Sequence, residues 1–387
     1  MVVSSISGIR GVANQDLTPD GVASYATSFA AVTSAKEVLV GRDTRSSGDM
    51  FRRATGGALV AAGVRVVDYG IISTPALFRE SRVRNVPAVM LSASHNEPEW
   101  NGIKLVIGGR GIMQHELDKV LSPTGKSEGA IPAGRIVDRR KSSYNSEVAD
   151  RAGRGSAEGV SVAIDMNGGA AIEHAPAILD AVGAKVKVIG GSPGVFSRTI
   201  DPTNDQLSVL RETVRGDGLD AGFAFDCDGD RLVLVDDEGE KRTGDFMLAL
   251  ALKKMLPLLE DRSVVVSVDT SMAVEDVVTQ LGGTLYRSKV GEANVVSTML
   301  EKGASMGGEG SSGGLIDGSY NYCRDSMIAV TVITRALRKG GSRTFREVPT
   351  YRQVRLKFPM DRMISVSPRV RKTPNTAVLS WVLMTSM

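Results

Sequence analysis

The chain has 387 residues, of which 42% are hydrophobic, 24% are charged and 5% are aromatic. At roughly 150 residues per domain, this length predicts two to four domains with a large buried core and excludes a disulfide-stapled miniprotein. The 47 basic and 44 acidic residues leave a net charge of +3 with no basic cluster, so we expect no nucleic-acid partner.

The cellular setting follows from the cysteines and the N-terminus. Cys227 and Cys323 stand far apart, without zinc-site spacing or a disulfide framework, which fits a reducing compartment. The first residues, MVVSSISGIR, lack the basic and apolar regions of a signal peptide, and no run approaches the roughly 18 apolar residues of a membrane span. We therefore expect a cytoplasmic protein with no membrane partner, and the sequence leaves a homodimer open.

Strand-like apolar runs alternate with helix-like stretches along the chain, a pattern typical of an α/β protein with a large parallel component. Near the N-terminus, the pattern predicts a strand ending at Val38 to Val40 and a helix starting after Ser46 or Ser47. The Gly-, Pro- and Ser-rich segment 122–134 predicts a surface loop.

A similar unit recurs along the chain: a helix end, a glycine cap and a β-rich run. Its three copies lie at 61–70, 180–191 and 279–289, with the caps near Gly63, Gly183 and Gly283. The recurrence predicts three consecutive similar α/β/α modules with mixed, largely parallel sheets.

The module boundaries follow from the strands that begin each new unit. Strand-like runs open at 161 and 263, the second after a helix expected from about Gly244 to Leu259. We expect domains at 1–150, 151–258 and 259–350, followed by an incomplete fourth domain at 351–387. This end of the chain has no acidic residue after Arg362 and no clear helix or strand period.

The strongest local signal is a group of carboxylates between two apolar runs, at Asp226, Asp228 and Asp230. Three charges this close repel one another unless a hard divalent cation such as Mg²⁺ binds them. An EF-hand counted from Asp226 needs Gly and Glu where this chain has Arg231 and Asp237, so that loop is excluded. A solvated acidic hairpin turn is the alternative.

A second signal is the loop that follows the apolar run PAVML, which contains Ser94 and His95. We expect Ser94 to be exposed at the carboxyl end of a strand, where open α/β sheets place ligands. A hydrolase dyad is weakly supported, because neighbours on an extended chain point to opposite faces and no G-x-S-x-G elbow is present. By itself, a loop of this composition is more often surface polarity than a nucleophile.

Two glycine-rich segments, 288–294 and 306–318, lack the P-loop pattern, and such segments are usually flexible turns. In the second segment, Glu309, Ser311 and Ser312 could present oxygens to sugar hydroxyls. Arginines beside glycines in SGIRG and GRDTR, at 7–11 and 41–45, suit a phosphate or a surface salt bridge equally.

Taken together in this order, the motifs resemble those of the α-D-phosphohexomutase superfamily over about residues 4 to 360. The motifs are SGIRG, GRDTRSSG, SASHNEPEWNGIKL, DMNGG, DPTNDQL, FDCDGDRLVLVD, KVGEANV, GGEGSSGG and RDSM. The resemblance implies that Ser94 carries and donates a phosphoryl group. It also implies that Ser94 and the aspartates of the DCDGD motif hold Mg²⁺.

The same resemblance implies roles for further residues. Acid/base and phosphate-orienting roles correspond to Arg10, His95 and Lys104, with Arg231 and Lys289 nearby. Glu309 and the serines after it match the sugar-binding loop. The implied activity interconverts hexose 1-phosphate and 6-phosphate through a phosphoserine and a sugar bisphosphate intermediate.

The chain departs from the family pattern at three places, and these departures leave two other functions open. Glu97 stands where proline is usual, the GGEGSSGG loop is one residue longer than the commonest form, and no R-x-S-G-T-E-P phosphate loop is present. We expect the mutase activity, and the missing loop leaves two alternatives: a metal-dependent sugar-phosphate phosphatase and a catalytically impaired sugar-phosphate-binding protein.

Overall fold

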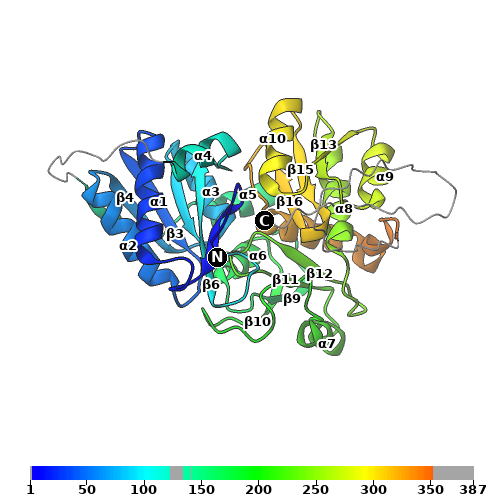
Figure 1. Cartoon of the computed structure of the whole chain (residues 1–387). Coiled ribbons are helices and arrows are strands. Elements are labelled where there is room, and N and C mark those ends of the chain that lie inside the picture. The colour runs from blue at the N-terminus through cyan, green and yellow to red at the C-terminus, as the bar shows by residue number, and fades with distance from the viewer. Residues whose placement is uncertain (1, 123–133, 140, 352–387) are drawn as a thin grey trace, which may run out of the picture.

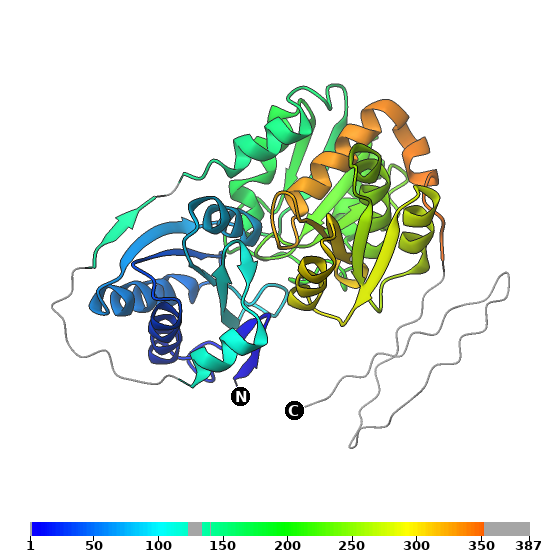
Figure 2. The same ribbon diagram turned by 90° about the horizontal axis from the view of Figure 1, so that it is seen from above.

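The computed structural model describes residues 2–122, 134–139 and 141–351. Most of the expected surface loop 122–134 and nearly all of the expected fourth-domain remnant at 351–387 lie outside these residues. Three β-sheets with their helices make up the described part, and Figure 1 shows the N-terminal one apart from the other two. From above, the three parts surround a common junction (Figure 2).

The first sheet has eight strands in the order β1-β2-β6-β5-β3-β4-β8, with β7 paired to β6. Strands β4, β5 and β8 run parallel with β3, whereas β6 is antiparallel to β5. The strands are β1 (Val3–Ser5), β2 (Gly8–Val12), β3 (Glu37–Arg42), β4 (Arg65–Ile71), β5 (Ala88–Leu91), β6 (Trp100–Ile107), β7 (Arg110–Gly111) and β8 (Ile136–Asp138). The helices are α1 (Pro19–Val32), α2 (Gly48–Ala61), α3 (Thr74–Arg84) and α4 (Gln114–Leu121).

The second sheet has four strands in the order β10-β9-β11-β12. Its strands are β9 (Ser161–Asp165), β10 (Lys185–Ile189), β11 (Ala221–Phe225) and β12 (Leu232–Val235). The helices around it are α5 (Tyr144–Ala152), η1 (Ala170–Glu173), α6 (Ala175–Ala181) and α7 (Ser208–Asp217). The expected domain limit at residue 150 falls within α5 and stays a prediction.

The third sheet has four strands in the order β14-β13-β15-β16. Its strands are β13 (Ser263–Ser267), β14 (Thr284–Ser288), β15 (Met306–Glu309) and β16 (Gly314–Asp317). The helices are α8 (Gly244–Met255), η2 (Leu256–Leu258), α9 (Met272–Gln280), α10 (Glu292–Lys302), η3 (Gly310–Ser312), α11 (Ser326–Gly340) and η4 (Gly341–Arg346).

All three sheets contain the same four-stranded unit, which confirms the predicted α/β class and the repeated modules. In each unit two parallel pairings are followed by one antiparallel pairing, as in β4-β3-β5-β6 of the first sheet. The helix-ending glycines have the left-handed backbone that favours glycine, at Gly63 (φ 78°) and Gly183 (φ 88°) as expected. In the third unit this residue is Gly282 (φ 70°) and not Gly283.

The core lies between the sheets and their helices, and it explains the long apolar runs in the sequence. Every residue of β5, β11 and β12 is buried, as expected for strands that are covered on both faces. No helix within the described ranges is both long and apolar enough to cross a membrane.

Candidate active site

Three motifs occupy the same position in the three modules: the turn between the third strand and its antiparallel partner. The β5–β6 turn carries Ser94, the β11–β12 turn carries the three aspartates, and the β15–β16 turn begins at Glu309. Because the three sheets meet at one junction, the repeated topology brings motifs that lie far apart in the sequence into contact.

Ser94 is fully buried, so the expectation of an exposed serine is wrong. Its Oγ donates a hydrogen bond of 2.8 Å to Asp226 Oδ2, and its exposed fraction is 0%. The backbone at Ser94 is left-handed (φ 51°) and not extended. This conformation is costly for a residue with a side chain and occurs most often at functional sites. The fold therefore presents this hydroxyl to the aspartates at some conformational cost.

Arg45 fixes the turn that carries Ser94. Its Nη2 donates to the carbonyls of Ser94 and Asn96 at 2.7 Å each, and Nη1 donates to that of Trp100 at 2.9 Å. Its Nε pairs with Asp43 at 3.0 Å, and both side chains are inaccessible to solvent. Arg45 of the GRDTR motif is therefore neither a phosphate ligand nor a surface ion pair.

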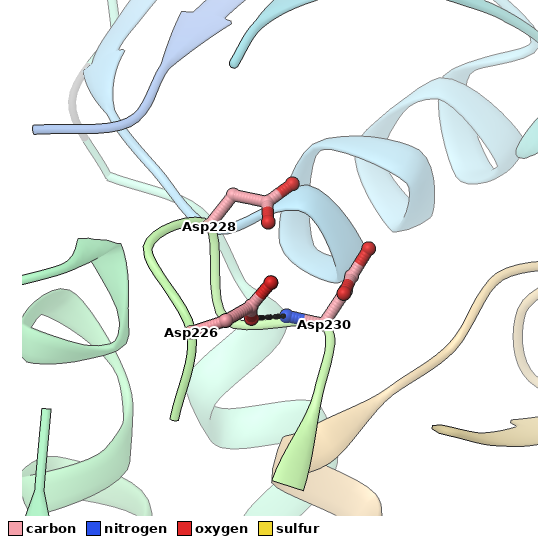
Figure 3. A group of neighbouring side chains, drawn as sticks. All are labelled: Asp226, Asp228 and Asp230. Carbon is pink, nitrogen blue, oxygen red and sulfur yellow. Dashed lines mark hydrogen bonds between the residues drawn. The ribbon is translucent and has the colours of Figure 1, made fainter. Parts of the chain in front are cut away.

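The three aspartates form a buried cluster on one tight turn (Figure 3). Asp226 Oδ1 accepts the backbone N–H groups of Asp230 and Arg231 at 3.1 Å each. One ligand atom from each aspartate lies within 4.8 Å of the others. Burial, together with the charges of Asp230 and Asp228, raises the pKa of Asp226 well above its ordinary value. The turn is thus not a solvated acidic hairpin.

The cluster fits a divalent cation in its donor chemistry. Asp228 Oδ1 and Asp230 Oδ1 are buried and accept no hydrogen bond within the described part of the chain. Carboxylate oxygens are the ligands that hard cations such as Mg²⁺ prefer, and buried acceptors rarely stay unpartnered. With Ser94 Oγ beside Asp226, the residues expected to hold a cation lie together.

Lys104 and Thr74 bring positive charge and hydrogen bonds from the first module to the aspartates. Lys104 Nζ lies 2.5 Å from Asp228 Oδ2 and 3.3 Å from Asp230 Oδ2, and Thr74 Oγ1 donates to Asp228 Oδ2. Burial favours the neutral amine, but the two carboxylates outweigh it and raise the pKa of Lys104. Burial likewise opposes ionisation of Asp228, yet Lys104 and Thr74 hold its pKa below the usual range.

Arg10, His95 and Arg231 lie at the same junction. Arg10 Nη1 donates to Asn96 Oδ1 at 3.0 Å, while Arg231 Nη1 pairs with Asp201 at 3.2 Å. Burial and the neighbouring arginines lower the pKa of His95 to about 2, so its imidazole is neutral. Its Nδ1 is buried and has no hydrogen-bond partner among the described residues.

The sugar-loop candidates are more ordered than the glycine-rich sequence suggests. Glu309 ends strand β15 and is 4% exposed, and its Oε1 accepts the N–H of Gly291 at 2.7 Å. The expectation of a mobile loop is therefore wrong for Glu309. Ser312 is buried and its Oγ donates to the Glu309 carbonyl, whereas Ser311 is half-buried. Lys289 is exposed, and its Nζ has no partner in the described ranges.

Several residues that hold this site together were missed from the sequence. Arg324 contacts Asp230 of the second module, and Glu292 and Glu309 of the third. The motif RDSM contains Arg324 and KVGEANV contains Glu292, but neither short pattern shows that the two side chains meet, or that Arg324 reaches Asp230 of the second module. Thr74 gave no signal beyond its place before a proline, and the GRDTR motif indicated Arg45 only as a phosphate ligand or a surface ion pair.

Comparisons with known proteins agree with this arrangement. Residues 4–128, 142–239 and 243–351 match the family models for phosphoglucomutase/phosphomannomutase α/β/α domains I, II and III. Phosphoglucosamine mutase of Thermotoga sp. strain RQ2 is 34% identical over 364 residues, which cover 90% of this chain and 83% of that protein. Phosphoglucosamine mutase of Thermotoga maritima is 33% identical over 364 residues, or 90% and 82% of the two chains.

Solved structures share the fold. A phosphoglucomutase/phosphomannomutase family protein from Burkholderia thailandensis matches with a TM-score of 0.77 and 24% identity, over 89% of this chain and 79% of that one. Parafusin (phosphoglucomutase) from Paramecium, in its open form, matches with a TM-score of 0.71 and 18% identity, over 87% and 70% of the two chains. The three family models and the identity to the mutases establish that the chain belongs to the α-D-phosphohexomutase superfamily.

Proposed function

We propose that this chain interconverts the 1-phosphate and 6-phosphate of a hexose or hexosamine through a phosphorylated Ser94. The 2.8 Å hydrogen bond between Ser94 Oγ and Asp226, inside a buried cluster of three carboxylates, carries this proposal. Phosphoryl transfer depends mainly on positioning and on charge stabilisation around the moving group. This cluster supplies a hydroxyl acceptor and oxygen ligands for a cation.

In the proposed cycle, the bond between phosphorus and Ser94 Oγ breaks as a hydroxyl of the sugar phosphate forms a new bond to that phosphorus. The sugar bisphosphate then turns in the site and returns its other phosphoryl group to Ser94 Oγ. A Mg²⁺ ion held by Asp226, Asp228 and Asp230 would offset the charge of the transferring oxygens. The sugar leaves with its phosphate at the other position.

The proton of the attacking hydroxyl needs an acceptor, and we assign this role to His95. Lys104 contacts Asp228 and Asp230, which raise its pKa, so we assign it the role of a hydrogen-bond donor and not of the proton acceptor. His95 is neutral, and Arg231 and Arg10 contribute to its low pKa. Bound phosphate groups offset those positive charges, so substrate binding increases the basicity of the imidazole.

We assign recognition of the substrate to two groups of residues at the junction, one for its phosphate groups and one for its sugar hydroxyls. Arg10 and Arg231 supply guanidinium groups that can hold phosphate oxygens, and Lys289 adds an exposed ammonium. Glu309, with Ser311 and Ser312, supplies oxygens for the sugar hydroxyls. Because the relatives at 33% and 34% identity are named phosphoglucosamine mutases, the substrate panel includes hexosamine phosphates.

The test is to incubate the purified chain with Mg²⁺, a trace of hexose bisphosphate, and the 1-phosphates of glucose, mannose or glucosamine. Phosphorus NMR follows the appearance of the 6-phosphate, and mass spectrometry of the Ser94 peptide detects the phosphoserine. Release of inorganic phosphate without the 6-phosphate would instead indicate a phosphatase. Calorimetric binding with neither product would indicate a binding protein.

A further inference from the structure

Arg324 connects groups from two modules at the centre of the site. Its Nη2 lies 2.8 Å from Asp230 Oδ2, and its Nη1 lies 3.2 Å from Glu309 Oε2 and 3.2 Å from Ser312 Oγ. Its Nε and its backbone N–H both contact Glu292 Oε2, at 3.1 and 2.9 Å. Every nitrogen of this side chain therefore donates to an oxygen, and the acceptors come from three separate segments.

The surroundings make these contacts strong. The exposed fraction of Arg324 is 7%, and those of Asp230 and Glu309 are 0% and 4%. Buried carboxylates need a paired cation, and a hydrogen bond between charged groups is about twice as strong as a neutral one. A planar guanidinium can meet separate carboxylates along fixed directions, which an ammonium cannot do.

Arg324 also determines which oxygen of Asp230 is available to a cation. Both Arg324 and Lys104 donate to Oδ2, whereas Oδ1 accepts no hydrogen bond in the described part of the chain. The guanidinium thus fixes the rotation of the carboxylate and leaves one oxygen of Asp230 as a ligand. The same guanidinium holds the carboxylate of Glu309.

The segment before Arg324 is itself anchored to the first module. Asn321 Nδ2 donates to the Pro75 carbonyl at 2.9 Å, and Arg82 Nη1 donates to the Gly318 carbonyl at 3.0 Å. Arg324 also lies against Gly314, where any side-chain Cβ would collide with its Cδ. Its position is fixed from both sides.

We propose that Arg324 is a positioning residue. It fixes the position of Glu309, the sugar-recognising carboxylate, relative to Asp230, the cation ligand. The juxtaposition of both carboxylates on one buried guanidinium carries the inference, which rests on the function proposed above. One side chain thereby controls two separate binding events, of the sugar and of the cation.

The experiment compares Arg324→Lys, which keeps the positive charge but removes the planar guanidinium, with Glu309→Gln. Calorimetry on the protein without phosphoserine measures the dissociation constant of Mg²⁺ alone, and that of glucosamine 6-phosphate or glucose 6-phosphate at fixed Mg²⁺. For Arg324→Lys we expect both constants to rise by about tenfold or more, as for the loss of one charge-assisted hydrogen bond. For Glu309→Gln only the sugar-phosphate constant should rise.

Two further variants separate positioning from a general loss of structure. Gly314→Ala removes no charged group but displaces Arg324, so it should weaken the binding of both ligands as Arg324→Lys does. Arg338→Lys, on an exposed arginine of helix α11, which begins two residues after Arg324, should change neither constant. Circular dichroism establishes that each variant is folded.

The inference is overturned if folded Arg324→Lys binds both ligands within about twofold of the wild type, or weakens only one of them. Failure of the proposed function gives a different result. In that case the wild type produces no 6-phosphate from any hexose 1-phosphate, while the two dissociation constants still report on Arg324. A wild type that binds no sugar phosphate at all would overturn both proposals.

Discussion

The Arg45 guanidinium and the Ser94 carbonyl are joined by a buried hydrogen bond of 2.7 Å across 49 residues of sequence. Arg45 in turn pairs with Asp43, whose Oδ2 accepts the Ser92 hydroxyl at 2.7 Å. The Ser92 hydroxyl accepts the Ser94 N–H at 2.8 Å. The left-handed conformation of Ser94 is thus held by donors and acceptors on both sides of the residue.

Arg45→Ala should destabilise the protein by about 3–5 kcal/mol, because it leaves the Asp43 carboxylate buried without its cation. Turnover should fall in the variant that remains folded, since the backbone carbonyls of the Ser94 turn lose the guanidinium that donates to them. Urea unfolding followed by circular dichroism measures the first effect. The control is Arg53→Ala, whose side chain is 74% exposed and should cost less than about 1 kcal/mol. Equal unfolding midpoints for the two variants would contradict the role of Arg45.

Ser94→Ala should abolish phosphoryl transfer while leaving the fold intact. The substitution removes one hydroxyl, and Asp226 keeps the two backbone hydrogen bonds to its other oxygen. The measurement is mutase flux together with mass spectrometry of the phosphoenzyme. Ser28→Ala is the matched control, because Ser28 is also a buried serine with one hydrogen bond, to the Val120 carbonyl, and lies outside the site. Flux in Ser94→Ala near the wild-type value would exclude Ser94 as donor.

Asp228→Asn should weaken Mg²⁺ binding and turnover together, since it removes one of three ligand charges. It also leaves the Lys104 ammonium with a weaker partner. Calorimetric titration with Mg²⁺ gives the affinity independently of activity. Glu238→Gln, an exposed acid after strand β12, serves as the control for a change of net charge. An unchanged Mg²⁺ affinity in Asp228→Asn would show that the aspartates serve the turn and not a cation.

His174 should make stability fall in mild acid. Its Nε2 accepts the Ser73 N–H at 3.1 Å, and burial lowers its pKa to about 3. The unfolded chain, with a pKa of about 6.5, binds this proton first, so the stabilisation is complete above that value. It is lost progressively as the pH falls from about 6.5 towards about 3. Between pH 7 and pH 5 the loss should be about 2 kcal/mol.

Urea unfolding of the wild type and of His174→Gln at several pH values checks this expectation. The variant should show a flatter dependence on pH, whereas His115→Gln, at an exposed histidine, should follow the wild type. Parallel curves for the wild type and His174→Gln would assign the acid sensitivity to other groups.

Local patterns explain what could be predicted from the sequence. The glycine caps and the apolar runs report on neighbouring residues, so they indicated the α/β class and the repeated module. The acidic cluster at Asp226, Asp228 and Asp230 is equally local, because the apolar runs on either side place it on one turn between two strands.

Contacts between distant segments explain what could not be predicted. Ser94 is buried because Arg45 and Asp226 reach it across 49 and 132 residues. Arg324 meets Asp230 across 94 residues, and no pattern of neighbouring residues encodes that contact. The glycines around Glu309 predict a mobile loop, whereas in the structure they let the backbone and Arg324 pack closely.

The β5–β6, β11–β12 and β15–β16 turns lie where the three modules meet, and this position has a consequence for how the protein loses activity. Ser94 and Asp226 belong to different sheets, so a small rotation of one module would separate them without breaking a strand pairing. The modules meet through a shared apolar core and through polar side-chain contacts such as those of Lys104 and Arg324, whereas each sheet is held by backbone hydrogen bonds between its strands. Turnover should therefore be lost at urea concentrations well below those at which the circular dichroism signal of the sheets begins to change.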